Sequence, residues 1–507
     1  MVFSLKLMLL LLPAVLCGKT VEEWKGRIIY QILTDRFSPH GPTPSTPCTA
    51  LRSYCGGKFK GIQQRLDYIK GLGANAIWIS PIVLNTPGGF HGYWAKNIYE
   101  INPEFGTKQD LKDLIKACHD KDIWVMVDVV PNHMGYNDGC FWNNPCTPTK
   151  LNNFTGFVPF DKPEYYHQYC EIMDWNNQTE VEFCRLAHLP DLSQENDIVK
   201  RLLLDWIGNL TINYDIDGYR IDTLKLVPKW FWSEFQARAG AYCIGEATGS
   251  DPQYVAGYQD SVDGLLNFPM YNALRDVFNE NKSIRNLTKK IQEQRRYFKE
   301  LSRHGLFLDN HDQRRFLNWT SDYTVLKNAL TYVILGEGIP IIYYGTEQGF
   351  SGGHDPNDRE SLWPYYSTQS DIYKFIAGLT KLRLSHLSHF VSGGQREMAA
   401  NDDFFVFTRG KENQFLVVLT NRGNTSGTLE WNVQVPVLKA ETVYKNFFDE
   451  TDTVTVDNGT LKLKLTGGLP KVFLAVQTPT SKAERSSGVT WKLVFVCILL
   501  LHLLSLE

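Results

Sequence analysis

Residues Asp217–Lys225 read DGYRIDTLK, a short apolar run that is interrupted and ended by charged side chains. Three further stretches share this layout: DVVPNH at Asp128–His133, YCIGEA at Tyr242–Ala247 and FLDNHD at Phe307–Asp312. Continuous apolar runs are typical of buried parallel strands, and in a parallel barrel the chemistry lies at the carboxyl ends of the strands. We therefore expect these four strand ends to converge on one pocket.

Around these stretches, from Arg27 to about Leu379, short apolar runs alternate with segments that repeat apolar residues every three or four positions. The expected strands are Ile28–Leu33, Ala76–Ile79, Trp124–Val129, Gly218–Ile221, Ala241–Gly245, Gly264–Leu266, Leu306–Leu308 and Ile339–Tyr343. The expected helices include Gly61–Gly71, Lys108–Lys121, Val199–Asn209 and Ser321–Leu335. Eight strands alternating with helices predict an α/β fold, a (β/α)8 TIM barrel.

The connection between the third and fourth strands is unusually long and is rich in Asn, Pro, Cys and aromatic residues. Loops of that length are normally functional or form a unit of their own. We expect an inserted subdomain at 132–192, so that the barrel comprises 18–131 and 193–384.

After the barrel the sequence changes to alternating, Thr- and Val-rich segments, which are typical of antiparallel sheets. A C-terminal β-sandwich domain is expected over 385–476, with strands at Phe404–Arg409, Gln414–Thr420, Thr442–Asn446, Thr453–Val456, Thr460–Leu465 and Lys471–Val476.

Both ends of the chain read as targeting segments. Residues 1–17 carry one lysine and then an apolar run too short to span a membrane, as a secretory signal peptide does. Residues 477–507 comprise a polar stalk, small residues and a final apolar stretch, the pattern of a glycolipid (GPI) anchor signal. Ser481 and Ser486 are both candidate attachment residues. These segments predict export to the cell surface, with the protein held at the plasma membrane or in the cell wall.

Cysteines and glycosylation sequons agree with an oxidising, exported environment. Three close pairs in loop-like sequence are expected to form disulfides, namely Cys48 with Cys55, Cys140 with Cys146 and Cys170 with Cys184. Cys118 and Cys243 lie in apolar segments and are expected to be buried thiols. Asn-X-Ser/Thr sequons occur at Asn153, Asn177, Asn209, Asn281, Asn286, Asn318, Asn424 and Asn458.

The overall charge argues against one class of partner. The net charge is −3 over 507 residues, without a long basic run, so nucleic-acid binding is not expected. No protein partner is indicated either.

Acids at three of the strand ends indicate the chemistry. Asp222, Glu246 and Asp312 supply carboxyl groups, and a retaining glycosidase needs a carboxylate nucleophile about 5 Å from a carboxyl acid/base. Arg220 lies two residues before Asp222, so both side chains point to the same face of a strand. Its fixed charge is expected to keep Asp222 ionised. For a single acid at a strand end, capping the next helix is the commoner role.

Ten motifs in order make the chain resemble the α-amylase family of glycoside hydrolases, and especially the secreted fungal α-amylases. They are YQILTDRF, YCGGKFKGIQQRLDYIKGLG, FHGYWAKNIY, MVDVVPNHMG, LPDL, DGYRIDTLK, YCIGE, LDNHDQRRF, GIPIIYYGTEQ and GGHDPNDRE. The resemblance implies that Asp222 is the nucleophile, Glu246 the general acid/base and Asp312 the stabiliser of the transition state.

The same resemblance implies further ligands. Substrate-binding residues on the family's pattern are His91, Tyr93, Trp94, His133, Arg220, Lys225, His311, Asp355 and Arg359. Taken alone, Asp355 and Arg359 are equally consistent with a surface ion pair. Calcium is the implied cofactor, bound by Asn132, Glu182, Asp191 and the backbone carbonyl of Leu226, and it is expected to tie the insertion to the barrel.

One departure from the family's pattern affects specificity. Leu226 stands where the family usually has a histidine, which removes an imidazole from the leaving-group side. The first hypothesis is a calcium-dependent, retaining endo-hydrolase of α-1,4-glucans at the cell surface. The alternatives are an anchored α-glucanotransferase of cell-wall assembly and a non-catalytic glucan-binding wall protein.

Overall fold

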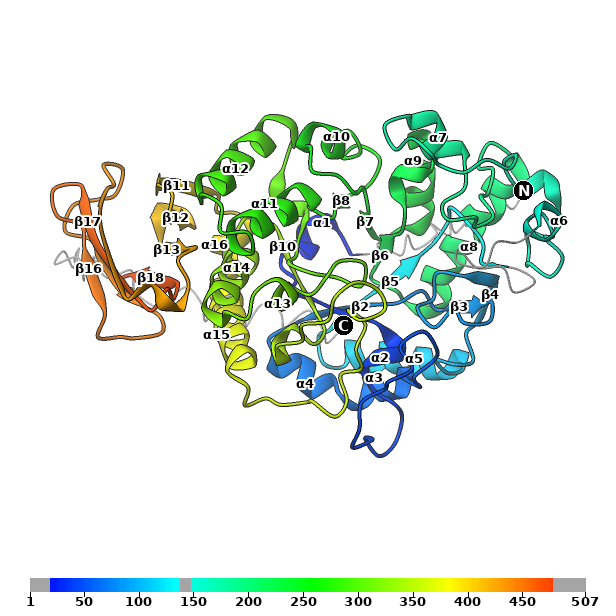
Figure 1. The fold of residues 1–507 in the computed structure, drawn as a ribbon, viewed down its shortest axis with the longest axis horizontal. Coiled ribbons are helices and arrows are strands. Elements are labelled where there is room, and N and C mark those ends of the chain that lie inside the picture. Colours follow the sequence, from blue (N-terminus) through cyan, green and yellow to red (C-terminus); the bar gives the residue numbers. More distant parts are fainter. Residues whose placement is uncertain (1–18, 137–146, 477–507) are drawn as a thin grey trace, which may run out of the picture.

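A ring of eight parallel strands lies at the centre of the computed structural model, which describes residues 19–136 and 147–476 (Figure 1). The strands are β1 Ile29–Ile32, β2 Ala76–Ile79, β5 Trp124–Val129, β6 Gly218–Ile221, β7 Tyr242–Gly245, β8 Gly264–Leu265, β9 Gly305–Leu306 and β10 Ile339–Tyr343. They follow the order β8-β7-β6-β5-β2-β1-β10-β9, and a parallel bridge between Leu266 and Gly305 joins its two ends. The predicted barrel is confirmed.

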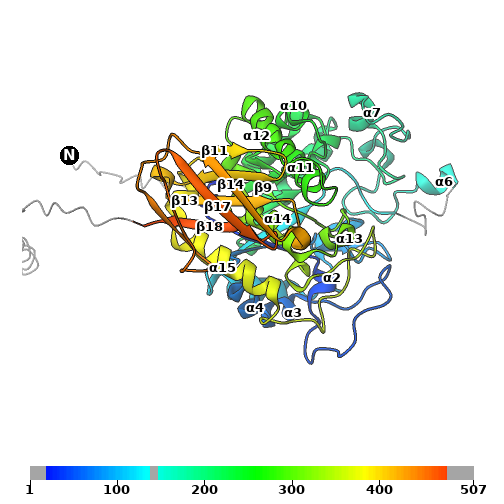
Figure 2. The same ribbon diagram turned by 60° about the vertical axis from the view of Figure 1, so that its left-hand side comes forward.

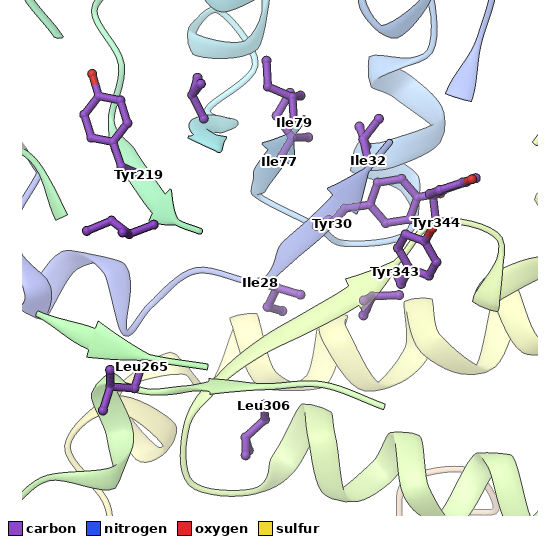
Figure 3. Packing of buried hydrophobic residues seen from close by; sticks show 14 of the residues in the cluster. Ile28, Tyr30, Ile32, Ile77, Ile79, Tyr219, Leu265, Leu306, Tyr343 and Tyr344 are labelled. Atoms are coloured by element: carbon purple, nitrogen blue, oxygen red, sulfur yellow. The ribbon is translucent and has the colours of Figure 1, made fainter. Parts of the chain in front are cut away.

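Alternation along each strand explains why these runs are apolar throughout. Ile29, Ala76 and Trp124 are neighbours in the register and pack together inside the ring. Tyr30 and Ile77 point the other way, into the layer between strands and helices that Figure 3 shows. Because both faces of each strand are buried, neither face needs polar residues. The charged side chains of the site accordingly lie in or just beyond the last residues of the strands, such as Asp128 in β5 and Arg220 in β6.

Helices surround the barrel, and polar caps define where several of them begin. The longer ones are α5 Lys108–His119, α8 Asp197–Tyr214, α9 Lys229–Ala239, α11 Phe268–Phe278, α12 Arg285–Tyr297, α14 Tyr323–Leu335 and α15 Asp371–Ser385. Asn196, Asp322 and Ser370 accept backbone N–H groups at the starts of α8, α14 and α15, a contact worth about 1 kcal/mol each.

One predicted helix differs from the structure. The segment expected as a single helix over Gly61–Gly71 forms two short helices, α3 Phe59–Gln64 and α4 Leu66–Gly71. The break falls at Arg65, whose φ of −111° and ψ of 11° lie outside the helical region. An apolar spacing alone does not report such a break, since both helices face the same core.

The insertion follows β5 and is joined to the barrel at several points. Its described helices are α6 Pro148–Leu151 and α7 Gln178–Phe183, and Cys170–Cys184 forms the predicted disulfide. A parallel bridge connects Val158 to Asn97 on β4 Ala95–Ile101. Strand β4 pairs with β3 Val83–Asn85 in a hairpin that the sequence did not predict. The Cys140–Cys146 pair lies outside the described residues.

The C-terminal β domain contains two antiparallel sheets, as predicted (Figure 2). The larger sheet has the order β11-β12-β13-β18-β15-β16, and β14 pairs with β17 in the smaller one. The bounds are β11 Gln395–Ala400, β12 Phe404–Arg409, β13 Phe415–Thr420, β14 Thr428–Gln434, β15 Val443–Asn446, β16 Thr453–Thr455, β17 Thr460–Thr466 and β18 Lys471–Ala475. Two strands, β11 and β14, were not predicted. Val406, Val433 and Leu463 belong to the core between the sheets.

Asn328 of α14 joins the barrel to the β domain. Its amide donates to the carbonyl of Gly468 at 2.8 Å, and its carbonyl accepts from the backbone N–H of Thr420 at 2.8 Å. The side chain is fully buried, so both contacts lie inside the interface. The barrel and the β domain therefore share a polar contact in addition to their apolar packing.

Two other sequence predictions have outcomes here. Cys118 and Cys243 are buried thiols, as expected. The signal peptide and the anchor signal lie outside the described residues. Within the described ranges, no helix combines the length and the apolar character that crossing a membrane requires.

Candidate active site

The four charged strand ends converge, as the sequence predicted, on a pocket of about 420 Å³. Asp222 lies just after β6 and Glu246 just after β7. Asp312 belongs to the segment that follows β9, and His133 to the segment that follows β5. The lining residues also include His91, Tyr93, Trp94, Lys225, Leu226, His311, Asp355 and Arg359.

Arg220 of β6 is the centre of the polar network at this end of the barrel. Its Nη1 donates to Oδ1 of Asp222 at 2.7 Å and to Oδ1 of Asp128 at 3.0 Å. Its Nη2 lies 3.0 Å from Oε2 of Glu246, an ion pair without hydrogen-bond alignment. The guanidinium is fully buried and remains charged, so it attracts all three carboxyl groups. One cation thus fixes the relative positions of two of the three predicted catalytic acids.

The backbone around the two acids is held by the barrel ladder. The N–H of Asp222 donates to the carbonyl of Val129, and that of Glu246 donates to the carbonyl of Ile221. Thr223 follows with a φ of +50°, which is rare for a β-branched residue. In that conformation its N–H donates to Oε2 of Glu246 at 3.1 Å. The unfavourable backbone of Thr223 is therefore used to orient Glu246.

Burial and the charge of Arg220 have opposite effects on the acids of this network. Burial raises the pKa of Asp222, and the positive charge of Arg220 opposes the rise. Burial likewise raises the pKa of Asp128 to about 6, again against the charge of Arg220. The arginine therefore favours the carboxylate form of Asp222 that a nucleophile requires.

Asp312, in the segment that follows β9, belongs to a second network. Nη2 of Arg359 donates to its Oδ1 at 3.1 Å, and Nε2 of His311 lies 3.1 Å from its Oδ2. Arg359 also contacts Oδ1 of Asp355 at 3.1 Å, so the two residues of the DPNDRE segment do form an ion pair. Arg359 is almost fully buried, unlike the residues of an ordinary surface pair. It therefore serves to position both acids.

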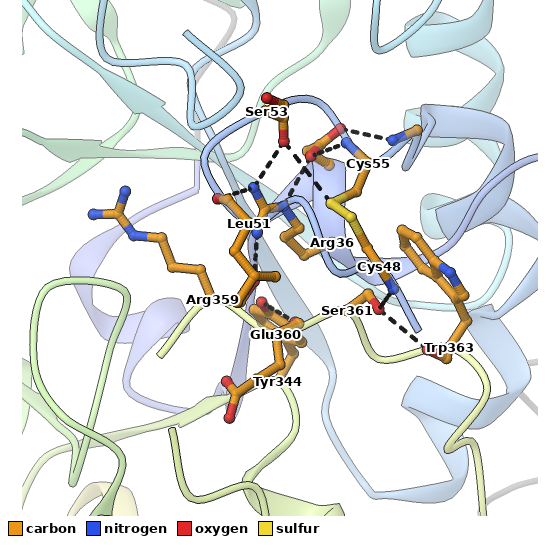
Figure 4. Close-up of a disulfide and its surroundings, with 12 residues drawn as sticks. Arg36, Cys48, Leu51, Ser53, Cys55, Tyr344, Arg359, Glu360, Ser361 and Trp363 are labelled. Carbon is orange, nitrogen blue, oxygen red and sulfur yellow. Dashed lines mark hydrogen bonds and ion pairs between the residues drawn. A yellow bond between two sulfur atoms is a disulfide. The ribbon is translucent and has the colours of Figure 1, made fainter. Parts of the chain in front are cut away.

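Arg359 is itself supported from behind by Arg36, as Figure 4 shows. Nη1 of Arg36 donates to the carbonyl of Arg359 at 2.7 Å, and its Nη2 donates to the carbonyl of Leu51 at 2.7 Å. The disulfide Cys48–Cys55, which the sequence predicted, closes the loop that carries Leu51. The N–H of Cys48 donates to Oγ of Ser361, which ties that loop to the segment after Arg359.

Aromatic and imidazole rings form one wall of the pocket. Tyr93 stacks on His311 with ring centroids 5.1 Å apart, and its hydroxyl donates to Oδ2 of Asp128 at 2.6 Å. His91 packs edge-on against Trp94 at 4.6 Å. Burial lowers the pKa of His91 and His311, and it lowers that of His133 to about 4. The three imidazole rings are consequently neutral near pH 7. Each can donate a hydrogen bond to a hydroxyl group or accept one from it.

The remaining side of the pocket holds Lys225, Leu226 and Trp175. Nζ of Lys225 donates to the carbonyl of Thr248, two residues beyond Glu246. The same ammonium group lies 4.9 Å from the ring centre of Trp175, which is half exposed. Leu226 is buried and lines the pocket beside them. Leu226 and the indole ring of Trp175 thus add apolar surface to the lining beside the ammonium group of Lys225.

The predicted calcium ligands lie in two pairs in the described structure. Asn132 and Asp191 are adjacent, because His133 and Asp191 form an antiparallel bridge. Glu182 lies on α7, which packs on the short 3₁₀ helix η2 Leu224–Leu226. Gln178 connects α7 to η2, since its amide donates to Oε1 of Glu182 and to the carbonyl of Lys225.

The chemistry of these residues fits a hard cation. Oδ1 of Asn132 is buried and has no hydrogen-bond partner, so an oxygen suited to a metal ion is available there. Among the described residues no group of three or more His, Cys, Asp and Glu side chains is placed to hold a metal. The predicted set contains only two acids, so amide and carbonyl oxygens must complete it.

The sequence predicted no role for several residues of the site, among them Asp128 and Trp175. Asp128 was quoted within DVVPNH but received no role, although it is the direct β5 neighbour of Arg220 in the register. The signal was available, because an acid at the same depth of the adjacent strand faces the same side as the arginine. Trp175 lies in the insertion, and its position at the pocket depends on the fold of that loop, so no local pattern indicates it.

Comparison with known proteins agrees with this geometry. The chain matches the α-amylase catalytic domain family over residues 31–381. It is 36% identical over 472 residues to alpha-amylase 2 of Schwanniomyces occidentalis, covering 90% of this chain and 91% of that protein. It is 36% identical over 473 residues to the alpha-amylase of Saccharomycopsis fibuligera, covering 89% and 92%.

Among solved structures, an α-amylase from Malbranchea cinnamomea superposes with a TM-score of 0.84 at 35% identity, covering 90% of this chain and 98% of that one. The family match spans the barrel and all three acids, and the similarity extends through the β domain. The chain belongs to the α-amylase family and is a glycoside hydrolase.

Proposed function

We propose that the protein is an α-amylase that hydrolyses internal α-1,4-glucosidic bonds of α-glucans with retention of configuration. The observation that carries this proposal is the contact of one buried guanidinium, that of Arg220, with both Asp222 and Glu246. Two carboxyl groups bound to one cation lie close together, and a short separation is what distinguishes retaining from inverting glycosidases.

In the first step a carboxylate oxygen of Asp222 attacks the anomeric carbon of the sugar. The bond between that carbon and the leaving oxygen breaks, and the Glu246 carboxyl group donates its proton to this oxygen. The product is a glycosyl ester on Asp222 and a shortened glucan. Asp312, held by Arg359, stabilises the positive charge that develops on the sugar ring.

In the second step Glu246, now a carboxylate, removes a proton from water as the water oxygen attacks the same carbon. The ester bond to Asp222 breaks, Asp222 leaves as a carboxylate and Glu246 regains its proton. Two inversions give net retention. The neutral rings of His91, His133 and His311 are suited to hold hydroxyl groups of the sugar throughout.

The test is to incubate the glycosylated protein with a maltooligosaccharide of defined length and to determine the lengths and anomeric form of the products. Shorter products in the α-configuration support the proposal. Products of β-configuration would contradict retention. The Asp222→Asn variant serves as the control and is expected to form no product.

A glucanotransferase is the second candidate, and Leu226 is the observation that favours it. Leu226 lines the pocket together with Lys225 and Trp175, and on the family's pattern it stands on the leaving-group side, where an acceptor would also bind. An apolar surface there disfavours ordered water relative to a sugar ring. The same assay decides, because a transferase yields products longer than the starting oligosaccharide. Binding of the oligosaccharide without turnover would support the third reading, a non-catalytic glucan-binding protein.

We further propose that calcium binds Asn132, Glu182, Asp191 and the carbonyl of Leu226. The unpartnered Oδ1 of Asn132 supports the proposal, as does the contact of α7 with η2, which brings Glu182 toward Leu226. When bound, the ion supplies a positive charge that holds oxygen ligands of the insertion and the barrel together. The residues themselves then keep the loop of His133 and the loop of Lys225 in place at the pocket.

The location proposed for the protein is the cell surface, reached by the secretory pathway and maintained by a GPI anchor. The apolar segments at 1–17 and within 477–507 support it. Treatment of intact cells with a phosphatidylinositol-specific phospholipase should release the protein into the medium. Protein that stays cell-bound after this treatment, in cells where a known anchored protein is released, would contradict the anchor.

A further inference from the structure

A second cavity, of about 550 Å³, lies between the barrel and the β domain. The barrel contributes Lys327 of α14 and the first turn and a half of α15, including Lys374 and Phe375. The β domain contributes the β15–β16 loop, with Phe448, and the β17–β18 loop, with Leu469. We call this cavity the interdomain groove. None of its lining residues belongs to the active-site pocket.

An aromatic pair forms the apolar part of the interdomain groove. The rings of Phe375 and Phe448 stack with centroids 5.2 Å apart and an interplanar angle of 16°. Phe375 is partly buried, whereas Phe448 remains 43% exposed. A Cβ atom placed on Gly378 would lie 3.4 Å from Phe448, so α15 packs directly beneath that ring. A held, half-exposed phenyl ring is a platform rather than a mobile side chain.

The loop that carries Phe448 is fixed by its own polar contacts. The N–H of Phe448 donates to Oδ1 of Asn446 at 3.1 Å, and Nδ2 of Asn446 donates to Oδ2 of Asp452 at 2.8 Å. The N–H of Thr451 donates to Oδ1 of Asp449 at 3.0 Å. Ordering this loop on binding therefore requires little conformational entropy.

The charges of the interdomain groove balance. Its lining holds three lysines and three aspartates, Lys327, Lys374, Lys471, Asp371, Asp449 and Asp452. Two of the lysines are already paired, Lys327 with Asp371 at 2.6 Å and Lys471 with Asp452 at 2.6 Å. A lining without net charge favours neither an anion nor a cation, yet it offers many donors and acceptors around an apolar ring. That combination suits an uncharged polyol with an apolar face, which is what a glucose unit is.

The position of the interdomain groove relates it to the active site. In a parallel barrel the strands run toward the catalytic end and each following helix runs back, so the first turns of the helices lie near that end. Asp371, Lys374 and Phe375 occupy the first turn and a half of α15, and Lys327 lies in the second turn of α14. The groove thus opens on the flank of the barrel near its catalytic end, where a long polymer can reach both sites.

From these observations we propose that the interdomain groove binds an α-glucan chain, with the ring of Phe448 stacked on a glucose unit and the ion pairs bonded to its hydroxyl groups. The choice of an α-glucan as the ligand of the groove rests on the function proposed above. It adds a second, non-catalytic contact with the polymer, which holds a long or insoluble glucan while the active site cleaves another part of it.

The experiment uses the full exported chain in the non-hydrolysing Asp222→Asn form and measures its adsorption to granular starch. Phe448→Ala is expected to weaken adsorption about two- to tenfold, as the loss of one stacking contact does. Phe448→Tyr, which keeps the ring, is expected to retain it. The matched control is Tyr297→Ala, which removes a 41% exposed aromatic side chain on α12, outside the groove, and is expected to have no effect.

A parallel measurement separates this inference from the proposed function. With Asp222 intact, Phe448→Ala is expected to cleave a short maltooligosaccharide at the wild-type rate but to digest granules more slowly. If wild-type protein cleaves the oligosaccharide but the Phe448→Ala form adsorbs like wild type, the groove proposal is overturned and the proposed function stands. Wild-type protein that cleaves no α-glucan would overturn the proposed function. A change of oligomeric state in Phe448→Ala, with adsorption unchanged, would identify the groove as an interface between copies and also overturn the proposal.

Discussion

The guanidinium of Arg220 lies 2.7 Å from Oδ1 of Asp222 and 3.0 Å from Oε2 of Glu246. Because Arg220 contacts both acids, the distance between the nucleophile and the acid/base depends on the position of this one side chain. The planar fork of arginine matches this task, because its two terminal nitrogens can contact different carboxyl groups at once.

Arg220→Lys should reduce kcat/KM about 10²- to 10³-fold, the usual effect of removing one positioned donor from a catalytic site. A lysine keeps the charge but has its three donors on one nitrogen, so it cannot reproduce the separate contacts of Nη1 with Asp222 and of Nη2 with Glu246. Steady-state kinetics with a maltooligosaccharide would measure the loss. The control is Arg238→Lys, at a surface pair with Asp205 in which both partners are more than half exposed, and it should be neutral. A loss of less than tenfold at Arg220 would contradict the argument.

Glu246→Gln and Asp222→Asn should differ when the leaving group needs no proton. On a maltooligosaccharide both variants should be inactive, the former by about 10²- to 10⁴-fold. With α-maltosyl fluoride, whose fluoride leaves unaided, Glu246→Gln should still form the glycosyl ester. Mass spectrometry of peptides should find the sugar on Asp222, because the second step also lacks its base. An ester on another residue would falsify the assignment.

Trp175→Ala should raise KM for longer maltooligosaccharides about two- to tenfold and leave cleavage of α-maltosyl fluoride unchanged. Trp175 lies beside Lys225 in the pocket lining, so its half-exposed ring is available to stack on a sugar of a chain that extends past Glu246. Trp230→Ala is the matched control, since that half-exposed tryptophan also faces a lysine, Lys200, but lies outside the pocket. Equal effects of both variants would contradict the assignment.

His304 should make the folded state more sensitive to acid. Burial lowers its pKa to about 3, and Arg303 adds to this effect, whereas an unfolded chain binds a proton near pH 6.5. Below pH 6.5 the unfolded state therefore binds more protons, so this contribution to stability is present at neutral pH and is lost as the pH falls toward 3.

The measurement compares wild type with His304→Gln, whose amide oxygen can accept the N–H of Leu265 as the imidazole does. The difference in unfolding free energy between the two proteins should shift by about 2 kcal/mol against wild type between pH 7 and pH 5. Urea unfolding at both pH values gives this quantity. A difference that stays constant with pH would show that His304 titrates normally.

Removal of calcium should lower the melting temperature of the wild-type protein. An ion present at a hundredfold excess over its Kd stabilises the folded state by about 2.7 kcal/mol. A chelator should remove this stabilisation, and calcium but not magnesium should restore it. Asn132→Ala should melt lower and respond less to the chelator. A wild-type protein whose melting temperature ignores both chelator and calcium would exclude this site.

The sequence predicted the parts of the fold that depend on burial. The eight barrel strands, such as Trp124–Val129, were recognisable because their residues are apolar on both faces. The strands β11 and β14 were missed for the opposite reason. In β14 only Val433 is fully buried, and the hydrophilic residues Glu430 and Asn432 face solvent, so the segment looks like a polar loop.

The catalytic acids were predictable because each follows an apolar run that forms a barrel strand, whereas their supports depend on contacts distant in the sequence. Arg36 and Arg359 are 323 positions apart, and only the closed barrel brings them into contact. Trp175 reaches the pocket through a loop of the insertion whose path no periodic pattern describes. Local patterns thus gave the acids, and tertiary packing determined what orients them.

The interface amide of Asn328 has a consequence for the independence of the two parts. A foreign β domain that covered Asn328 without a matching donor would leave its carbonyl unbonded inside the interface, at a cost of about 1–3 kcal/mol, because Thr420 supplies that donor here. The amide of Asn328 would lose Gly468 as an acceptor and keep the carbonyl of Thr324. The β domain is therefore not an interchangeable appendage. A recombination that exchanged it between relatives would succeed only if the incoming domain offered a matching donor and acceptor to position 328, so the two parts are expected to be inherited as one unit.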